Sequence, residues 1–334
     1  MSARILMIET GGTFGTELNE AGLRALSDCS VFDYPEVAAV IAEYGFEFEV
    51  MRPFRLLSEN MTLRRWQDLL SLVRSLDLSR YDGVIIAHGT DTLAYSVNLV
   101  ALALGKIGIP LVFVSANRPL SDPLSNGIAN FCGALTLLHS GEKGVFAVYR
   151  NGDGRVYVHR GGRLRQMDSL HPGFYSQHEV YFAEIVGGEV QINPDPRNLL
   201  TQTDFPGFRQ ETLCGDILQI HPYPTLNYDR FDLSGVKGVL HCTYHTGMYC
   251  AAGGAENLGS FLDRSGEIPV VVVGGTVTEA KYDSALKGVD KLIFCDDTAA
   301  ETVYLKMQFL LGDSCRERAL AALTANLIGE IVGA

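Results

Sequence analysis

Residues 4–17, RILMIETGGTFGTE, place a run of apolar residues directly before glycines that alternate with threonines. The apolar run is short and bounded by turn residues, which predicts a buried strand that ends in a loop. The loop offers hydroxyl groups and backbone N–H groups. It could be a phosphate cradle, a loop that carries a nucleophile or a simple tight turn. It lacks the lysine of a P-loop and the G-x-G-x-x-G spacing, so a nucleotide site is disfavoured.

The first half of the chain repeats this pattern of strand and helix. Runs rich in Val, Ile and Phe predict buried strands, and amphipathic stretches between them predict helices. The strands are expected at 4–10, 81–89, 110–116 and 144–150, and the helices at 35–45, 62–76, 91–105 and 126–140. Such alternation is typical of parallel βαβ units with both faces of the sheet covered.

After Arg150 the pattern changes. Residues 155–167 and 178–193 resemble hairpin strands, and a stretch rich in Pro and Asn at 192–208 indicates a linker. Strands return at 235–244, 267–275 and 290–297, separated by helical stretches at 256–266 and 279–288 and followed by one at 298–312. We therefore predict an α/β protein with a larger N-terminal parallel-sheet domain at 1–200, a linker at 201–213 and a smaller C-terminal α/β domain at 214–334.

Composition excludes several classes of partner. The formal net charge of -12 over 334 residues argues against a nucleic-acid partner, because such affinity comes largely from Lys and Arg. The longest apolar stretches fall below the ~18 residues of a membrane helix, and the first residues lack the apolar core of a signal peptide. Seven cysteines without a C-x-x-C pair indicate reduced thiols. We expect a cytoplasmic protein without a membrane partner, metal or cofactor.

Ligands of open parallel sheets bind beyond the carboxyl ends of the strands, so the residues after each strand decide the chemistry. Three such segments are TGGT at 10–13, HGTDT at 88–92 and SANRP at 115–119. One residue of Thr90, Asp91 and Thr92 is expected to cap the following helix. Capping accounts for one residue, whereas two hydroxyls, a carboxylate and the preceding His88 indicate a functional site.

These segments, with Ser58-Glu59-Asn60-Met61, resemble the bacterial-type L-asparaginase family in order and spacing over nearly the whole chain. The segments 116–130, 217–224 and 299–312 resemble further blocks of that family. The resemblance implies a two-domain asparaginase-like fold, a small amino acid as substrate and a homodimer or homotetramer. Without a signal peptide, the chain is similar to the cytoplasmic type.

The resemblance also implies the catalytic roles. Thr13 would be the nucleophile that forms an acyl-enzyme. Thr90 would orient or activate the attacking species, and its backbone N–H would help to hold the oxyanion. Asp91 would meet the α-amino group of the substrate and support the base. A Thr hydroxyl needs an adjacent base to act as a nucleophile at neutral pH.

Further residues would bind the substrate. Ser58 would bond the α-carboxylate and Glu59 the α-ammonium group, and Gly12, Gly89 and Ala116 would complete the substrate contacts. Glycines let the backbone approach the reacting carbonyl closely, and N–H donors at such a turn stabilise an oxyanion by ~3 to 4 kcal/mol each.

The sequence departs from the family at three positions. Leu23 stands where the family has a tyrosine on a mobile loop, and Met248 stands where it has an asparagine. Gln166, or Arg165 with a one-residue slip, stands where it has a lysine, and no lysine lies between Lys143 and Lys237. Arginine cannot serve as a base, and glutamine cannot relay charge. The departures concern proton handling more than fold.

Two functions remain open. The first is an amidohydrolase acting on an ω-amide, or a related acyl derivative, of an aspartate-like amino acid, with His88 or Glu17 as a substitute base. The second is a catalytically impaired homologue that binds an aspartate-like ligand as a sensor. The paired threonines favour the enzyme, because a binding protein does not need them. An oxidoreductase is disfavoured, because no acidic ribose partner follows at ~20 residues. The arginines at 160, 163 and 165 are expected on a solvated hairpin face.

Overall fold

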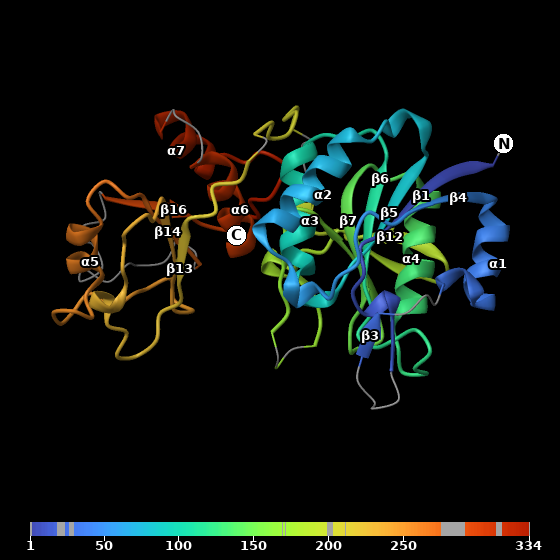
Figure 1. The fold of residues 1–334 in the computed structure, drawn as a ribbon, viewed down its shortest axis with the longest axis horizontal. Coiled ribbons are helices and arrows are strands. Elements are labelled where there is room, and N and C mark those ends of the chain that lie inside the picture. Colours follow the sequence, from blue (N-terminus) through green and yellow to red (C-terminus); the bar gives the residue numbers. More distant parts are fainter. Residues whose placement is uncertain are drawn as a thin grey trace.

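The computed structural model describes residues 2–18, 24–26, 30–168, 170, 172–198, 203–210, 212–274, 291–311 and 316–333. Within these ranges, only the backbone is described for Thr13, Leu18, 24–26 and 316–319. The chain forms two domains, the smaller built from its last third and the larger from the part that precedes it (Figure 1).

The larger domain is built on an eight-stranded sheet of order β12-β11-β8-β7-β6-β5-β1-β4. Its strands are β1 (Ala3–Glu9), β4 (Phe46–Met51), β5 (Gly83–Ala87), β6 (Pro110–Val114), β7 (Gly144–Arg150), β8 (Val156–Arg160), β11 (Ala183–Val186) and β12 (Glu189–Ile192). Strands β4, β1, β5, β6 and β7 run parallel, and β8, β11 and β12 extend the sheet in antiparallel register. The predicted parallel sheet and the predicted hairpins are both confirmed, and β4 is an additional strand that we did not predict.

Helices cover both faces of this sheet, as predicted. They are α1 (Pro35–Tyr44), α2 (Leu63–Ser75), α3 (Leu93–Leu104) and α4 (Gly127–Ser140). Successive residues of β1 point to opposite faces, so that Ile5 belongs to the core cluster that includes α1 and α4 residues. Leu6 belongs to the cluster under α2 and α3. The continuous apolar run of β1 therefore reflects burial on both faces.

The smaller domain has a four-stranded parallel sheet of order β13-β14-β15-β16. The strands are β13 (Ile217–Ile220), β14 (Gly238–Cys242), β15 (Val270–Val273) and β16 (Leu292–Cys295), and the helices are α5 (Leu258–Ser265), α6 (Ala300–Leu310) and α7 (Arg316–Thr324). Helix α6 packs against α3 of the larger domain, and Leu99 and Val303 share one core cluster. The helix expected at 279–288 lies outside the described residues.

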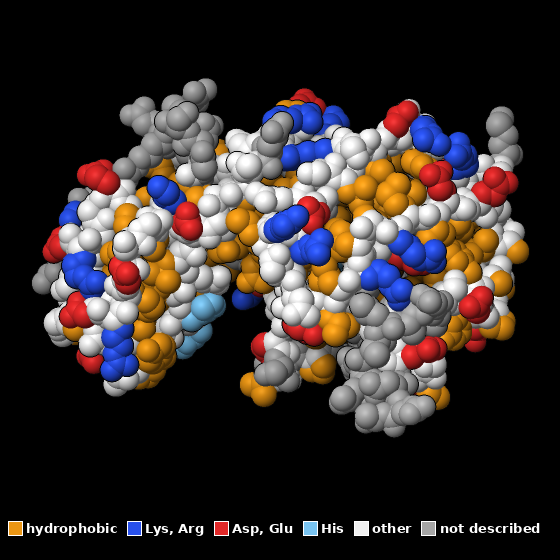
Figure 2. All heavy atoms as spheres, in the orientation of Figure 1, with side chains coloured by type: hydrophobic (Ala, Val, Ile, Leu, Met, Phe, Trp, Pro, Cys, Tyr) orange, Lys and Arg blue, Asp and Glu red, His pale blue; other side chains and the backbone are white. Residues whose placement is uncertain are grey.

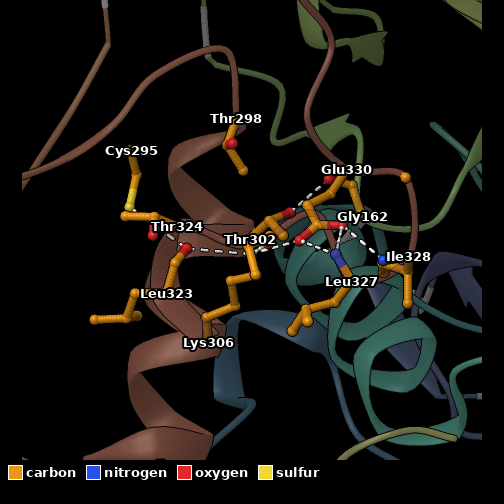
Figure 3. A network of polar contacts seen from close by, with 12 residues as sticks. Gly162, Cys295, Thr298, Thr302, Lys306, Leu323, Thr324, Leu327, Ile328 and Glu330 are labelled. Atoms are coloured by element: carbon orange, nitrogen blue, oxygen red, sulfur yellow. Dashed lines mark hydrogen bonds and ion pairs between the residues drawn. The ribbon is translucent and has the colours of Figure 1, made fainter. Parts of the chain in front are cut away.

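A buried ion pair fixes the end of the chain to α6 (Figure 3). The Lys306 ammonium group pairs with the Glu330 carboxylate, and both side chains are fully buried. Lys306 also donates to the Leu323 carbonyl at 3.2 Å, and Glu330 accepts the Ile328 N–H at 2.8 Å. The terminal segment therefore depends on a charge pair whose remaining polar atoms are satisfied by backbone.

No helix in the described ranges is both long and apolar enough to cross a membrane.

Candidate active site

The segments that follow β1 and β5 leave the sheet side by side. The two strands pair in parallel, with Glu9 opposite Ala87. Gly12 has φ +73°, and a Cβ atom there would lie 2.3 Å from the Cα atom of Gly89. Glycine is therefore required at position 12 for both conformation and space. The backbones of TGGT and HGTDT are in direct contact, and the expected convergence of the Thr13 and Thr90 hydroxyls stays a prediction.

The loop after β4 brings Ser58 to the same edge. The Ser58 hydroxyl donates to Asp91 Oδ2 at 3.2 Å and accepts the Asp91 N–H at 3.1 Å. The Thr92 hydroxyl donates to the Ser58 carbonyl at 3.1 Å. A Cβ atom at Gly89 would lie 2.3 Å from Ser58 Oγ, so Gly89 allows this approach. These bonds lock the short 3₁₀ turns Ser58–Asn60 and Thr90–Thr92 together.

The Thr90 hydroxyl differs from its neighbours. Thr10 Oγ1 donates to the Ala87 carbonyl at 2.8 Å, and Thr92 is bonded to Ser58. Thr90 is partly exposed, and its hydroxyl bonds to no other residue in the described part of the chain. A partly exposed hydroxyl without a protein partner, at the carboxyl edge of a sheet, is available to a ligand or a water molecule.

Gln166 holds the Thr90 segment in place. Its Nε2 donates to the Thr90 carbonyl at 2.8 Å, and its Oε1 accepts the Ala94 N–H in the first turn of α3 at 3.2 Å. Thr92 occupies the N-cap position but makes no side-chain cap bond. The expectation that one residue of 90–92 is the N-cap of α3 is confirmed for Thr92, but the side-chain acceptor comes from Gln166, in a distant segment.

Both domains fix the short strand β9 (Leu164–Arg165) that precedes Gln166. Asn98 of α3 donates to the Leu164 carbonyl at 2.8 Å. From the smaller domain, Glu301 Oε1 accepts the Gln166 N–H at 2.8 Å, and the Thr302 hydroxyl donates to the Gly162 carbonyl at 2.8 Å. Helix α6 thereby positions a side chain that contacts the active-site edge.

His88, offered by the sequence as a substitute base, is a buried histidine bonded to backbone. His88 is 1% exposed, and its ring Nδ1 lies 2.8 Å from the Gly89 carbonyl. Its backbone N–H donates to the Val114 carbonyl. Burial lowers the pKa of His88 to about 4, so the ring is neutral near pH 7. Such a buried ring is poorly placed to exchange protons with solvent.

The three hairpin arginines do not share one environment. Arg163 is 1% exposed and donates to the Gly329 carbonyl at 2.7 Å. The Arg160 guanidinium lies 4.5 Å from the centroid of the Phe182 ring. Arg165 is exposed. The expected solvated face is wrong for Arg163, because this side chain binds the C-terminal segment.

The remaining predicted residues are placed as follows. Glu59 is exposed beside Ser58, whereas Ala116 is fully buried in the core. Met248 is partly buried against the core of the smaller domain. Leu23 lies outside the described residues. The substrate-binding roles of Glu59 and Ala116 stay predictions.

A large open pocket of about 900 Å³ lies beside Gln166, between the two domains. Figure 2 shows a hollow there, with histidine side chains on the wall formed by the smaller domain. Among the described residues, no group of three or more His, Cys, Asp or Glu is arranged to hold a metal ion.

Comparison with known proteins identifies the family. The family described as Asparaginase, N-terminal matches residues 4–198. The L-asparaginase of Thermococcus kodakarensis is 26% identical over 342 residues, which cover 99% of each chain. A glutamyl-tRNA(Gln) amidotransferase subunit from Pyrococcus abyssi is 27% identical over 349 residues, which cover 98% of this chain and 76% of the relative.

Solved structures agree. The thermostable L-asparaginase from Thermococcus kodakarensis superposes with a TM-score of 0.82 at 25% identity, covering 99% of this chain and 100% of the other. L-asparaginase I from Vibrio cholerae, at 20% identity, has the same fold with a TM-score of 0.73 over 99% of each chain. The glycine-mediated contact between the segments after β1 and β5 thus lies within a matched family domain. The chain belongs to the asparaginase family and is an amidohydrolase of that family.

Proposed function

We propose that the protein hydrolyses an ω-amide, or a related acyl derivative, of an aspartate-like amino acid through a Thr13 acyl-enzyme. The observation that carries the proposal is the Thr90 hydroxyl, which bonds to none of the described side chains, beside the Ser58–Asp91 pair and one residue after Gly89, which contacts Gly12. In the first step, Thr13 Oγ attacks the amide carbonyl carbon, the C–N bond breaks and the nitrogen leaves protonated as ammonia. In the second step, water attacks the ester, releases the carboxylate product and returns the proton to Thr13.

The polar groups suit an amino acid with charges of both signs. Asp91 and Glu59 are carboxylates that attract the α-ammonium group. The Ser58 hydroxyl accepts the Asp91 N–H, which fixes its oxygen, and its hydrogen, donated to Asp91 Oδ2, can turn toward a substrate carboxylate. Binding would therefore exchange the Ser58–Asp91 bond for a bond from Ser58 to the substrate.

The transition state needs donors for its oxyanion. We assign the Thr90 N–H to this role. The bond from the Gln166 amide to the Thr90 carbonyl holds the other side of the same residue and so limits its movement. The close contact of Gly12 with Gly89 keeps the two loops near enough to share one reacting carbonyl. Preorganised N–H donors of this kind contribute ~3 to 4 kcal/mol each.

A second function, ligand binding without turnover, is favoured by the environment of Gln166. Both ends of its amide are used in bonds to Thr90 and Ala94, and an amide carries no exchangeable charge. Proton transfer must then use another group, water or the substrate itself. We therefore expect ammonia release from L-asparagine to be slow compared with that of ordinary family members.

The deciding experiment compares Thr13→Ala with Thr324→Ala, which removes an exposed hydroxyl on α7. A panel of ω-amides and esters is assayed for product, beside a thermal-shift screen with aspartate, glutamate and succinate. We expect Thr13→Ala to abolish hydrolysis without altering the melting temperature, and Thr324→Ala to be fully active. Full turnover by Thr13→Ala would remove Thr13 from the mechanism, and ligand stabilisation without any product in the unmodified protein would favour the sensor.

The oligomeric arrangement is part of the proposal. We expect a homodimer or homotetramer, and light scattering coupled to size-exclusion chromatography measures it. One of the relatives is named as an amidotransferase subunit, which makes hydrolysis within a larger assembly the competing arrangement. The formal charge of -12 gives the present chain little electrostatic affinity for tRNA on its own.

A further inference from the structure

A second pocket, of about 390 Å³, lies beside the turn between β7 and β8. Its lining includes Asp153, Tyr157, His159, Tyr175, Glu179 and Tyr181, and none of the residues assigned above to catalysis or substrate binding. The volume falls in the range of small-molecule sites. The sheet order places β8 away from β1 and β5, and the pocket adjoins the larger pocket beside Gln166, with which it shares Tyr175, Ser176 and Glu179.

One side of the pocket is aromatic. The rings of Tyr157 and Tyr181 meet edge to face with centroids 4.9 Å apart, and Tyr175 is 45% exposed. The faces of such rings attract cations. Arg155 illustrates this, because its guanidinium lies 5.2 Å from the centroid of Tyr157 while it pairs with Glu184.

The pocket is also acidic. Asp153 accepts the Arg155 N–H at 3.0 Å and the Tyr157 hydroxyl at 2.8 Å. These bonds, the backbone bond first, lower the pKa of Asp153, so the carboxylate is charged near pH 7. The carboxylate of Glu179 is exposed and pairs with no residue in the described ranges. The pocket therefore has more negative charge than its own cations neutralise.

The backbone at Glu179 is strained. His178 and Glu179 have φ angles of 52° and 60°, in the left-handed region that residues with a Cβ atom avoid. His178 is held by Asp297 of the smaller domain at 2.9 Å. Such conformations cluster at functional sites. Here the turn carries Glu179 to the edge of the pocket.

A buried acceptor completes the pocket. His159 is 2% exposed, and its Nδ1 lies 2.9 Å from the Ser176 hydroxyl. Burial lowers the pKa of His159 to about 3, so the ring is neutral. Its Nε2 has no partner in the described structure. When the ring proton is on Nδ1 and is donated to the Ser176 hydroxyl, Nε2 carries a lone pair without a donor. An unpaired acceptor is unfavourable in a buried position.

We propose that this pocket binds an organic cation, namely an amine or guanidine carried on an apolar body. An N–H group of the ligand donates to His159 Nε2, its charge is balanced by Asp153 and Glu179, and its apolar part packs against the tyrosine rings. An anion is disfavoured by both carboxylates. This site is independent of the proposed hydrolysis.

Titration calorimetry with phenethylamine tests the proposal, with 2-phenylethanol as the neutral analogue of the same shape. We expect the amine to bind about tenfold more tightly than the alcohol, equivalent to about 1.4 kcal/mol. The affinity for the amine should fall as salt is added, because the attraction is partly electrostatic.

Two variants locate the site. Glu179→Gln and Tyr181→Leu should each weaken phenethylamine binding severalfold, whereas Glu189→Gln on β12 and Tyr223→Leu, both at exposed positions outside the pocket, should not. Glu179 is exposed, so its substitution leaves the fold intact, and circular dichroism checks each variant. Equal affinities for amine and alcohol, an amine affinity unchanged in both pocket variants, or no binding at millimolar concentration would each overturn the proposal.

Discussion

The first turn and the middle of helix α6 hold buried polar groups of different kinds. At its first turn, Glu301 accepts the N–H of Gln166, whose uncharged amide holds the Thr90 segment of the active site. Farther along, Lys306 forms a fully buried ion pair with Glu330. The chain thus places a buried lysine where it anchors the terminal segment, and a neutral amide where the resemblance implied a lysine. The comparison teaches that the buried charge pair anchors the terminal segment, whereas a neutral amide positions the Thr90 segment of the site.

The largest expected effect concerns the ion pair. Lys306→Met leaves the Glu330 carboxylate buried without its cation, which should lower the free energy of unfolding by about 3 to 5 kcal/mol. Urea denaturation measures this change. A loss below about 1 kcal/mol, the range of exposed pairs, would break the comparison.

The double variant Lys306→Met, Glu330→Leu tests whether the loss of stability comes from the unpaired buried charge. Removing both charges avoids an unpaired buried ion, so the double variant should be more stable than Lys306→Met alone. It should remain less stable than the unmodified protein, because Glu330 also accepts the Leu327 and Ile328 N–H groups.

At the site, the neutral groups make stability depend on pH. The pKa of His88 is lowered from 6.5 to about 4 on folding, so the unfolded chain binds the proton more tightly. The contribution of neutral His88 to the free energy of unfolding is complete above pH 6.5. It declines as pH falls toward 4, by at most ~1.4 kcal/mol per pH unit. Denaturation midpoints across this range should fall less steeply in His88→Asn than in the unmodified protein.

Gln166 should affect catalysis more than stability. Gln166→Leu removes the bonds to Thr90 and Ala94, which should reduce kcat/KM for amide hydrolysis about tenfold and lower stability by about 1 to 2 kcal/mol. Gln166→Glu keeps an acceptor for the Ala94 N–H but cannot donate to the Thr90 carbonyl. It should therefore lose activity to a similar degree with a smaller loss of stability. Full activity of both variants would show that Gln166 does not position Thr90.

The smallest effect concerns an exposed pair of the same chemical kind as the buried one. Lys106 and Asp204 lie 2.8 Å apart, with 50% and 93% of their side chains exposed. Lys106→Ala should change the free energy of unfolding by less than about 1 kcal/mol, because solvent and salt screen exposed pairs. A loss as large as that of Lys306→Met would show that burial is not the reason for the difference.

Local pattern was sufficient for most of the fold. The predicted strand at 144–150 and helix at 126–140 agree with β7 and α4, because burial repeats with the period of each element. Strand β4 was not predicted, although its sequence FEFEVM alternates apolar and charged residues. The glycines of TGGT and HGTDT signalled a close approach of backbones, and the structure shows the contact between Gly12 and Gly89.

The sequence by itself determined the α/β architecture, the family and the segments at the carboxyl edge of the sheet, since these depend on short-range periodicity and on motifs in a fixed order. Only the tertiary structure decided that Gln166 caps α3, that Arg163 is buried beneath the terminal segment, and that His159 Nε2 has no partner among the described residues beside a tyrosine-lined pocket. These facts depend on contacts between residues far apart in the chain. Sequence periodicity predicts which face of a helix or strand is buried, but it does not predict which distant residue contacts that face.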